Sequence, residues 1–569
     1  MKLLRTSLVL VLLLIIIAAA WLWFNRPSPV DLATYAPADS LLYIELNNPS
    51  AVARAIQDTD VWKAAAPITH SQIGSESKLA MAAARSGVGP IEAVLFARTQ
   101  IALVVVGLDA AEQNDTLRVK PEFAVIAETH TSAWRTKPAI TAAVKQLASF
   151  VYGASNCSER SGDAEYVECS VTGGERKIIG AVDCTLVVIA NTENAVRKCL
   201  EAKRGTRPNL LTDAELVRVR SSFASNQPLG FGYISASNSA KLFSWAAPLW
   251  MGRGPGDRQL EQLLAVSAGK ILRGVAWTAV TSGGGIEDRY LFSLEPDVVR
   301  RLQPAFETSQ QDPNFWKLVP SGFQSLTIYR SKEPALAWRS LDSAVGLQLD
   351  ALPAVLFGTL LKSSLTPYGI SDPKEVLTTL APPLLTLRPS AAFDGSVLVA
   401  RVIDETRLKR SLVQELFRSS NGQMVNGIQS ELDPELEFAA VFADGYVLLG
   451  RTENMQSCLS ALRQSAAMNS GKMQQESQEN SAPILTYAND ELRLKNFIST
   501  LMMLQGRRLS AEEIADLQKS LRDYSFSSTE TRLGSSGIER KTHSAFGQFS
   551  TFVSLLQSDS QNVDRKSVV

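Results

Sequence analysis

Hydrophobic and polar positions divide the chain into one long apolar run and a series of shorter, patterned segments. Residues 7–24 read SLVLVLLLIIIAAAWLWF and carry no charge, while Lys2 and Arg5 precede them. A helix of this length would be roughly 27 Å long, close to the ~30 Å hydrocarbon thickness of a bilayer. The run therefore predicts a membrane-spanning helix.

The end of this run decides between a membrane anchor and a cleaved signal peptide. A signal peptide has an apolar region of about 7–15 residues that ends at a small-residue cleavage site. Ala18–Ala20 would serve as such a site, but Trp21–Phe24 continue the run and are typical of a membrane interface. We therefore expect an uncleaved signal anchor and a single-pass protein of the inner (cytoplasmic) membrane. Because Lys2 and Arg5 precede the helix, the chain from about Pro27 onward should be extracytoplasmic, in the periplasm.

Short strand and helix patterns then recur in the same order in two parts of the chain. APADSLLYIELNNPSAVARAI begins at Ala36 and VPSGFQSLTIYRSKEPALAWRSL at Val319, and each indicates a strand followed by a helix. The clearest match pairs VVIANTENAVRKCLEA, from Val187, with VLLGRTENMQSCLSAL, from Val447. Further matches join the strand pairs after residues 89 and 372, the segments from Pro228 and Pro483, and the turns from Ser282 and Gly534.

These matches predict an α+β fold. We expect an N-terminal transmembrane helix followed by two tandem, diverged copies of a mostly antiparallel sheet-plus-helices unit. The expected division is a cytoplasmic stub, membrane anchor and linker (1–35), a first repeat unit (36–305), a second repeat unit (306–557) and a disordered tail (558–569).

Capping signals and polar composition predict local differences between the two copies. Thr212 and Glu215 predict a capping box in the first copy, and Ser510 and Glu513 predict another in the second. Residues 465–482, SAAMNSGKMQQESQENSA, are rich in Gln, Ser and Asn, which is typical of a mobile loop.

Composition and charge exclude one class of partner. Hydrophobic residues make up 45% and charged residues 20% of the 569 residues, as in an ordinary folded protein. Lys+Arg and Asp+Glu balance at 57 each, without a basic run that would neutralise phosphates. We therefore expect no nucleic-acid partner.

The five cysteines are Cys157, Cys169, Cys184, Cys199 and Cys458, and their spacing matches no zinc or haem motif. Cys157 and Cys169 flank a polar stretch in a way that would suit a loop-closing disulfide in an oxidising compartment. The alternative, which we favour at this point, is that all five are small buried apolar residues.

Histidines and glycines supply no catalytic motif. The three histidines, His70, His130 and His543, are scattered without metal-ligand spacing, and we interpret them as surface residues. Ser282–Gly285 lacks the Lys-Ser/Thr of a phosphate-binding loop, so a β-turn explains this segment and its match Gly534–Gly537.

Two polar groupings have a structural interpretation as well as a functional one. Asp58 and Asp60 are clustered carboxylates, but a solvated helix end accounts for them. The recurring Thr-Glu-Asn at 192–194 and 452–454 suits helix capping better than ligand binding, because free N–H groups at a helix start need acceptors. We therefore assign no catalytic, cofactor-binding or metal-binding residue and expect no cofactor.

The segment APADSLLYIELNNPSAVARAIQDTDVWKAAAP resembles the start of a bacterial envelope family catalogued as a domain of unknown function. The specific similarity, a Pro-Ala-Asp turn, a strand, a Pro-led helix and a Trp-Lys, covers about Pro37–Pro67. Ser321-Gly322 replace the Ala-Asp in the second copy, so Asp39 is not duplicated. The resemblance implies a membrane segment and a large extracytoplasmic region of weak repeats, and no mechanism.

Together these patterns favour a non-enzymatic, membrane-anchored envelope protein with a binding or assembly role. Its expected partners are the membrane, through residues 7–24, and an envelope protein, lipid or glycan. The alternatives are an extracytoplasmic hydrolase using carboxylate or serine chemistry, which needs two close acidic residues with shifted pKa values, and a lipid carrier, which needs a large apolar cavity.

Overall fold

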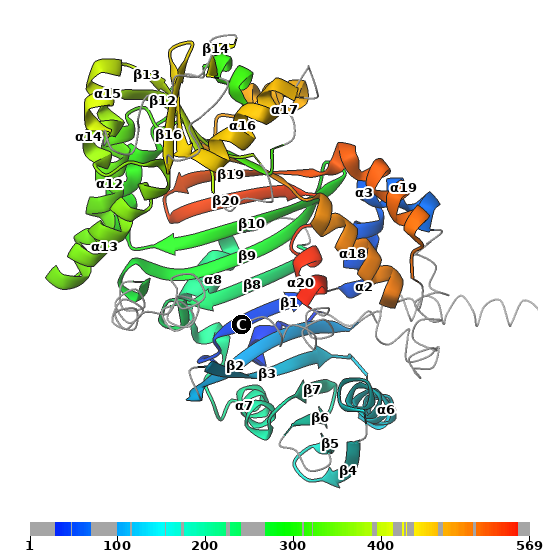
Figure 1. Ribbon diagram of the computed structural model, residues 1–569. Helices are drawn as coiled ribbons and strands as arrows, with labels where there is room; N and C mark the ends of the chain where they lie inside the picture. Colours follow the sequence, from blue (N-terminus) through cyan, green and yellow to red (C-terminus); the bar gives the residue numbers. More distant parts are fainter. Residues whose placement is uncertain are drawn as a thin grey trace, which may run out of the picture. The chain divides into compact units, whose positions relative to one another are not determined.

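The structure is a computed structural model of the 569-residue chain (Figure 1). It describes residues 29–46, 48–69, 99–113, 116–131, 133–153, 155–171, 176–223, 228–239, 268–309, 312–320, 323–389, 395–412, 424–425, 428–429, 437–464, 470–504 and 508–555. The predicted anchor at 7–24, His70 and the predicted tail at 558–569 lie outside these ranges.

The chain divides into two compact units. Unit 1 comprises Met1–Ala38, Glu45–Ser50 and Ala83–Thr212, and unit 2 comprises Asp39–Ile44, Ala51–Ala82 and Asp213–Val569. Strand β1 (Leu42–Leu46) and helix α2 (Pro49–Gln57) contain residues of both units.

The predicted membrane architecture is corrected. Across the described ranges, every helix is too short or too polar to cross a bilayer. In α6 (Ala133–Tyr152), for example, Val144 and Ala148 pack into the core of unit 1. The transmembrane helix, the signal anchor and the single-pass inner-membrane location with a periplasmic bulk are therefore wrong for the part of the chain that the structure describes.

The predicted pair of separate sheets is also wrong. Among the residues that the structure describes, eighteen strands belong to one sheet, and β14 (Met424–Val425) and β15 (Ile428–Gln429) form a second. The registered strand pairs are antiparallel, as expected, because hairpins and long returns connect the strands.

Unit 1 contains six antiparallel strands in the order β2-β3-β7-β6-β5-β4. Helix α6 packs on β5 and β6 through Ile140, Val144 and Ala148. The elements are η1 (Leu32–Thr34), β2 (Gln100–Gln113), β3 (Thr116–Glu128), α6 (Ala133–Tyr152), β4 (Ser155–Ser161), β5 (Glu165–Val171), β6 (Lys177–Asp183), β7 (Leu186–Ala190), α7 (Glu193–Lys203) and η2 (Leu210–Thr212).

In unit 2 the strand order is β8-β9-β10-β20-β19-β18-β11-β12-β13-β17-β16. The strands are β8 (Gly230–Ser235), β9 (Leu272–Ser282), β10 (Gly285–Leu294), β11 (Ser325–Tyr329), β12 (Leu380–Arg388), β13 (Val397–Val402), β16 (Phe438–Ala443), β17 (Tyr446–Arg451), β18 (Ile484–Asn489), β19 (Phe526–Gly534) and β20 (Gly537–Ser544). The helices are α3 (Asp60–Thr69), α8 (Ala214–Ser222), α11 (Pro296–Leu302), η3 (Gln303–Phe306), η4 (Pro313–Leu318), α12 (Pro334–Gly346), α13 (Ala351–Ser363), η5 (Thr366–Tyr368), α14 (Pro373–Thr378), α15 (Glu405–Ser411), α16 (Thr452–Gln464), α17 (Ser470–Glu479), α18 (Glu491–Leu504), α19 (Ala511–Leu521), η6 (Arg522–Tyr524) and α20 (Phe549–Leu555).

Strands β10 and β20 meet about a local two-fold axis. Each begins with a matching sequence, IEDR at 286–289 and IERK at 538–541, and the fourth residues, Arg289 and Lys541, lie opposite each other. Ile286 pairs with Ser544, while its counterpart Ile538 pairs with Phe292. The two hairpins β9–β10 and β19–β20 therefore join edge to edge in a self-complementary way.

Of three local turn and capping predictions, two are confirmed. Gly283 and Gly284 have φ values of 52° and 78° between β9 and β10, so the predicted turn is confirmed. The Ser510–Glu513 capping box on α19 is confirmed as well. The Thr212–Glu215 box is wrong, because Asp213 caps α8 and accepts from the N–H of Glu215.

Residues 470–479 form α17 instead of the predicted mobile loop. Arg330 on β11's C-terminal side is 3% exposed and donates to Ser477 O (2.7 Å), Ser477 Oγ (2.9 Å), Ala482 O (3.2 Å) and Asn480 O. The hydroxyl of Tyr487 donates to Met473 O at 3.2 Å. Tertiary hydrogen bonds thus order a segment that has little apolar surface of its own.

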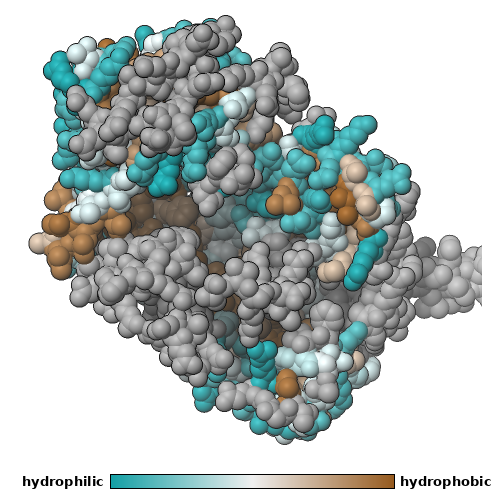
Figure 2. Space-filling view, in the orientation of Figure 1, coloured by the Kyte–Doolittle hydropathy of each residue, from teal (hydrophilic) through white to brown (hydrophobic). Residues whose placement is uncertain are grey.

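Helix α13 is apolar but none of its residues is buried. Leu352 and Val355 are 65% and 66% exposed. Figure 2 shows brown surface at the left, where Figure 1 draws α13. Its neighbour Asp350 pairs with Lys270 at 3.0 Å. This helix places open apolar surface on unit 2.

Candidate functional site

Unit 1 has an open groove of about 550 Å³ between the β4–β5 hairpin and the first turns of α7. We call it the hairpin groove. Its lining residues are Arg160, Ser161, Gly162, Asp163, Tyr166, Glu193, Asn194, Val196 and Arg197.

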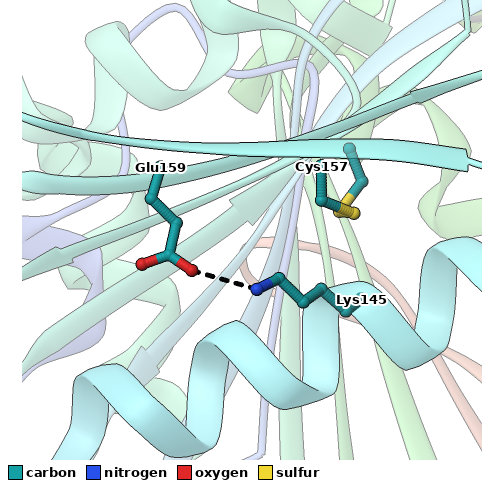
Figure 3. The surroundings of a disulfide bond; sticks show 4 residues. Lys145, Cys157 and Glu159 are labelled. Atoms are coloured by element: carbon teal, nitrogen blue, oxygen red, sulfur yellow. Dashed lines mark hydrogen bonds and ion pairs between the residues drawn. A yellow bond between two sulfur atoms is a disulfide. The ribbon is translucent and has the colours of Figure 1, made fainter.

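A disulfide holds the hairpin that forms one wall. Cys157 on β4 lies opposite Cys169 on β5, and their sulfur atoms are bonded at 2.02 Å. Figure 3 shows Lys145 of α6 reaching the carboxylate of Glu159 on β4, at 3.0 Å. The hairpin is thus tied covalently within itself and ionically to α6.

The cysteine interpretation was therefore wrong for one pair. Cys157 and Cys169 form a disulfide and are not free buried thiols. Cys199 and Cys458 are buried free thiols, as interpreted, and burial raises the pKa of each to about 12. Cys184 is free and exposed.

One ion pair spans the groove from the hairpin to the helix. Arg160 Nη2 donates to Glu193 Oε1 at 2.5 Å, and the guanidinium lies 4.6 Å from the centre of the Tyr166 ring. This hydrogen bond holds the pKa of Glu193 below its usual value. Glu193 therefore stays ionised, and its charge also suits the positive end of α7.

A second ionised carboxylate lies at the hairpin turn. Asp163 accepts from Arg204 Nη1 at 2.5 Å and from the Tyr166 hydroxyl at 2.8 Å. The bond from Arg204, followed by that from Tyr166, lowers the pKa of Asp163. Burial and the bond to Asp163 raise the pKa of Tyr166 to about 12, so Tyr166 remains a neutral donor.

The wall of the groove formed by α7 is held in place by a hydrogen bond to β3. Asn194 donates to Glu122 Oε2 on β3 at 2.9 Å and accepts from Arg197 Nη2 at 2.9 Å. Gly107 on β2 makes room for Glu122, because a Cβ at that position would lie 2.8 Å from Oε2. Arg197 is left with much of its surface facing solvent.

The Thr-Glu-Asn at 192–194 contributes both a helix cap and part of the groove lining. Thr192 caps α7 and accepts from Ala195 N at 3.1 Å, which confirms the capping interpretation, while Glu193 and Asn194 line the groove. The second occurrence differs: Thr452 is the first residue of α16, and Asn454 is 1% exposed.

Sequence reasoning missed the hairpin half of this site. Arg160 and Asp163 precede β5, and Tyr166 lies on it. β6 and β7 follow before α7, so only the strand order brings these residues beside Glu193. The one local signal was the density of charged residues around Cys157 and Cys169. Asp58 and Asp60 take no part, and Asp60 begins α3 as a helix-end residue.

The surface interpretation is wrong for one histidine. The side chain of His130 is 12% exposed and its Nε2 lies 3.2 Å from Gln100 Oε1. Its backbone N–H donates to the buried Glu128 at 3.0 Å, and Tyr35 donates to the same carboxylate at 3.0 Å. His130 adopts a φ of 52°, and Gln100 also bonds Val30, so this cluster fastens residues 30–35 to the sheet of unit 1.

In the described ranges, no three His, Cys, Asp or Glu side chains gather as metal ligands. The hairpin groove instead presents ionised, mutually paired groups of both signs, which are suited to hydrogen bonding. No family model, no curated protein and no solved structure matches the chain.

Proposed function

We propose that the protein is a non-enzymatic binding protein and that its hairpin groove holds a hydroxyl-rich ligand, a glycan. The observation that carries this proposal is the pairing of the charges that line the groove: Arg160 pairs with Glu193 across it, and Asp163 pairs with Arg204 beside it. Paired charges offer little net attraction to an ion, but they keep donors and acceptors side by side. Sugar hydroxyl groups both donate and accept, and therefore match such a surface.

The same chemistry argues against the hydrolase alternative at this groove. A general acid needs a carboxyl whose pKa is raised toward neutrality, whereas hydrogen bonds lower the pKa values of Glu193 and Asp163. A lipid carrier would need a large apolar cavity, and the lining of this groove is mainly polar and charged. Binding without chemistry is the role that these side chains support.

The test is a binding measurement on the full chain with a panel of oligosaccharides, followed by isothermal titration calorimetry on each hit. Arg197→Ala should weaken binding roughly tenfold, because it removes one charged donor from the groove wall. Lys145→Ala is the matched control: it also removes a cation of unit 1, but one that pairs with Glu159 outside the groove. Its affinity should equal that of the wild-type chain.

Two results would contradict the proposal. The first is that no oligosaccharide of the panel binds to the chain, whereas a polar peptide does. The other is equal affinity of the Arg197→Ala and wild-type chains for a glycan that does bind.

A further inference from the structure

The C-terminal helix α20 covers one face of the β9–β10 hairpin in unit 2, and Figure 1 draws it across the sheet beside α18. Trp277 on β9 makes edge-to-face contacts with Phe549 and Phe552 of α20, at ring-centre distances of 6.2 and 5.7 Å. Such pairs contribute about 0.5–1.5 kcal/mol each beyond their buried area. These aromatic contacts and the packing against α18 hold α20 on the sheet.

A carboxyl group lies beneath this helix. Asp288 on β10 is 1% exposed. Its Oδ1 accepts from Trp277 Nε1 at 2.8 Å, and its Oδ2 accepts from the backbone N–H of Gln548, which precedes α20, at 3.0 Å. One side chain thus joins the sheet to the start of the helix.

The chain approaches this carboxyl closely at Gly547, which has a φ of 55°. A Cβ at this position would lie 2.7 Å from Asp288 Oδ2, so no larger residue fits while the helix is in place. Because Asp288 is 1% exposed beneath this segment, hydration of its carboxyl requires the segment to move away.

Few charges face Asp288 from the elements packed against it. Glu287 is its neighbour on β10, Tyr290 lies on the same strand, and Arg493 is on α18, which packs against α20. Arg493 already donates to Asp490 at 2.5 Å. Burial raises the pKa of Asp288 to about 6, although the bonds from Trp277 and Gln548 and the charge of Arg493 oppose the shift.

We propose that α20 is a clasp that stays closed over Asp288 while this carboxyl is protonated and opens when the carboxyl ionises. Opening exposes the carboxyl to water, where its pKa returns to the ordinary value of 3.8. Ionisation is then easier in the open state than in the closed state, so the opening equilibrium constant rises with pH between these two values. A shift from 3.8 to about 6 corresponds to an increase of about a hundredfold.

The experiment is hydrogen exchange of the α20 amides in the full chain at about pH 4.5 and about pH 7.5, corrected for the intrinsic pH dependence of exchange. The protection factors of residues 549–555 should fall by up to about a hundredfold at the higher pH. In Asp288→Asn, which keeps the Oδ1 acceptor but cannot ionise, the two pH values should give equal protection. Asp297→Asn, which removes an exposed carboxylate from α11, should behave as the wild-type chain does.

Protection that does not change with pH in the wild-type chain would overturn the proposal, and so would an unchanged pH dependence in Asp288→Asn. Phe552→Ala covers the case in which Asp288→Asn does not fold. It removes one aromatic contact and leaves the carboxyl in place, so protection should be lower at both pH values with the same ratio between them. Loss of the ratio in this variant would count against the clasp.

Discussion

Replacing Arg330 with methionine should release α17 while the sheet of unit 2 stays folded. Arg330 is a buried cation. The acceptors described above for its guanidinium are all neutral: three backbone carbonyls and one hydroxyl. Burial lowers the pKa of its guanidinium. Those carbonyls belong to the last turn of α17 and the residues after it, where a helix exposes unpaired C=O groups and the negative end of its dipole.

The magnitude follows from the groups that would be left unpaired. Each buried carbonyl without a donor costs about 1–3 kcal/mol, and the recovered hydration of the arginine charge offsets part of that sum. We therefore expect Arg330→Met to destabilise α17 by about 3 kcal/mol. Arg330→Lys keeps the charge and three donors but loses the planar fork, so it should fall between the methionine variant and the wild-type chain.

Hydrogen exchange of residues 470–479 is the assay, because it measures opening of α17 apart from the rest of the chain. Arg532→Met is the matched control, since Arg532 on β19 reaches the same region but has a side chain that is 43% exposed. That variant should change protection by less than about 1 kcal/mol. Wild-type protection of α17 in Arg330→Met would refute the reasoning.

Three further changes test other parts of the fold. Replacing Cys157 and Cys169 together with serine should cost about 3 kcal/mol of hairpin stability, read as faster proteolysis between β4 and β5, because the bridge closes a short loop of 12 residues. Glu128→Ala should destabilise unit 1 by about 2–4 kcal/mol in denaturant unfolding, since Tyr35 and a backbone N–H lose their acceptor; Glu128→Gln should recover part of this. Because the pKa of Asp288 is raised in the folded state, its contribution to stability should be greatest below about pH 4, fall between about pH 4 and about pH 6, and stay low above that. Asp288→Asn should therefore stabilise unit 2 at about pH 8 by up to about 3 kcal/mol, less about 1 kcal/mol because the amide nitrogen no longer accepts from the N–H of Gln548. An unchanged unfolding midpoint would contradict this.

The features that could be predicted from the sequence depend on residues close together in the chain. Thr192 caps α7, Ser510 and Glu513 form their box, and Gly283 and Gly284 make the turn, since in each case the donor, the acceptor or the φ angle belongs to the same few residues. Even there, Asp213 displaced Thr212 as a cap, because two neighbouring acceptors compete for one helix end.

The features that could not be predicted depend on contacts across the sheet. Nothing near residue 470 shows that Arg330 will order α17, because that arginine is far away in the chain. The hairpin groove needs β4 and α7 side by side, and His130 is covered only because β3 ends beside Gln100 and residues 30–35. Composition and periodicity contain no information on such pairings.

The symmetrical meeting of β10 and β20 has a consequence for how the two hairpins can differ. Were the hairpins on separate molecules, their association would weaken on dilution, and any substitution would appear on both sides of the axis at once. Within one polypeptide the junction persists at every concentration, and each side is free to change by itself. The third residue of the matching sequences illustrates this freedom: Asp288 on one strand has Arg540 as its counterpart on the other, so a buried acid occurs on one side alone.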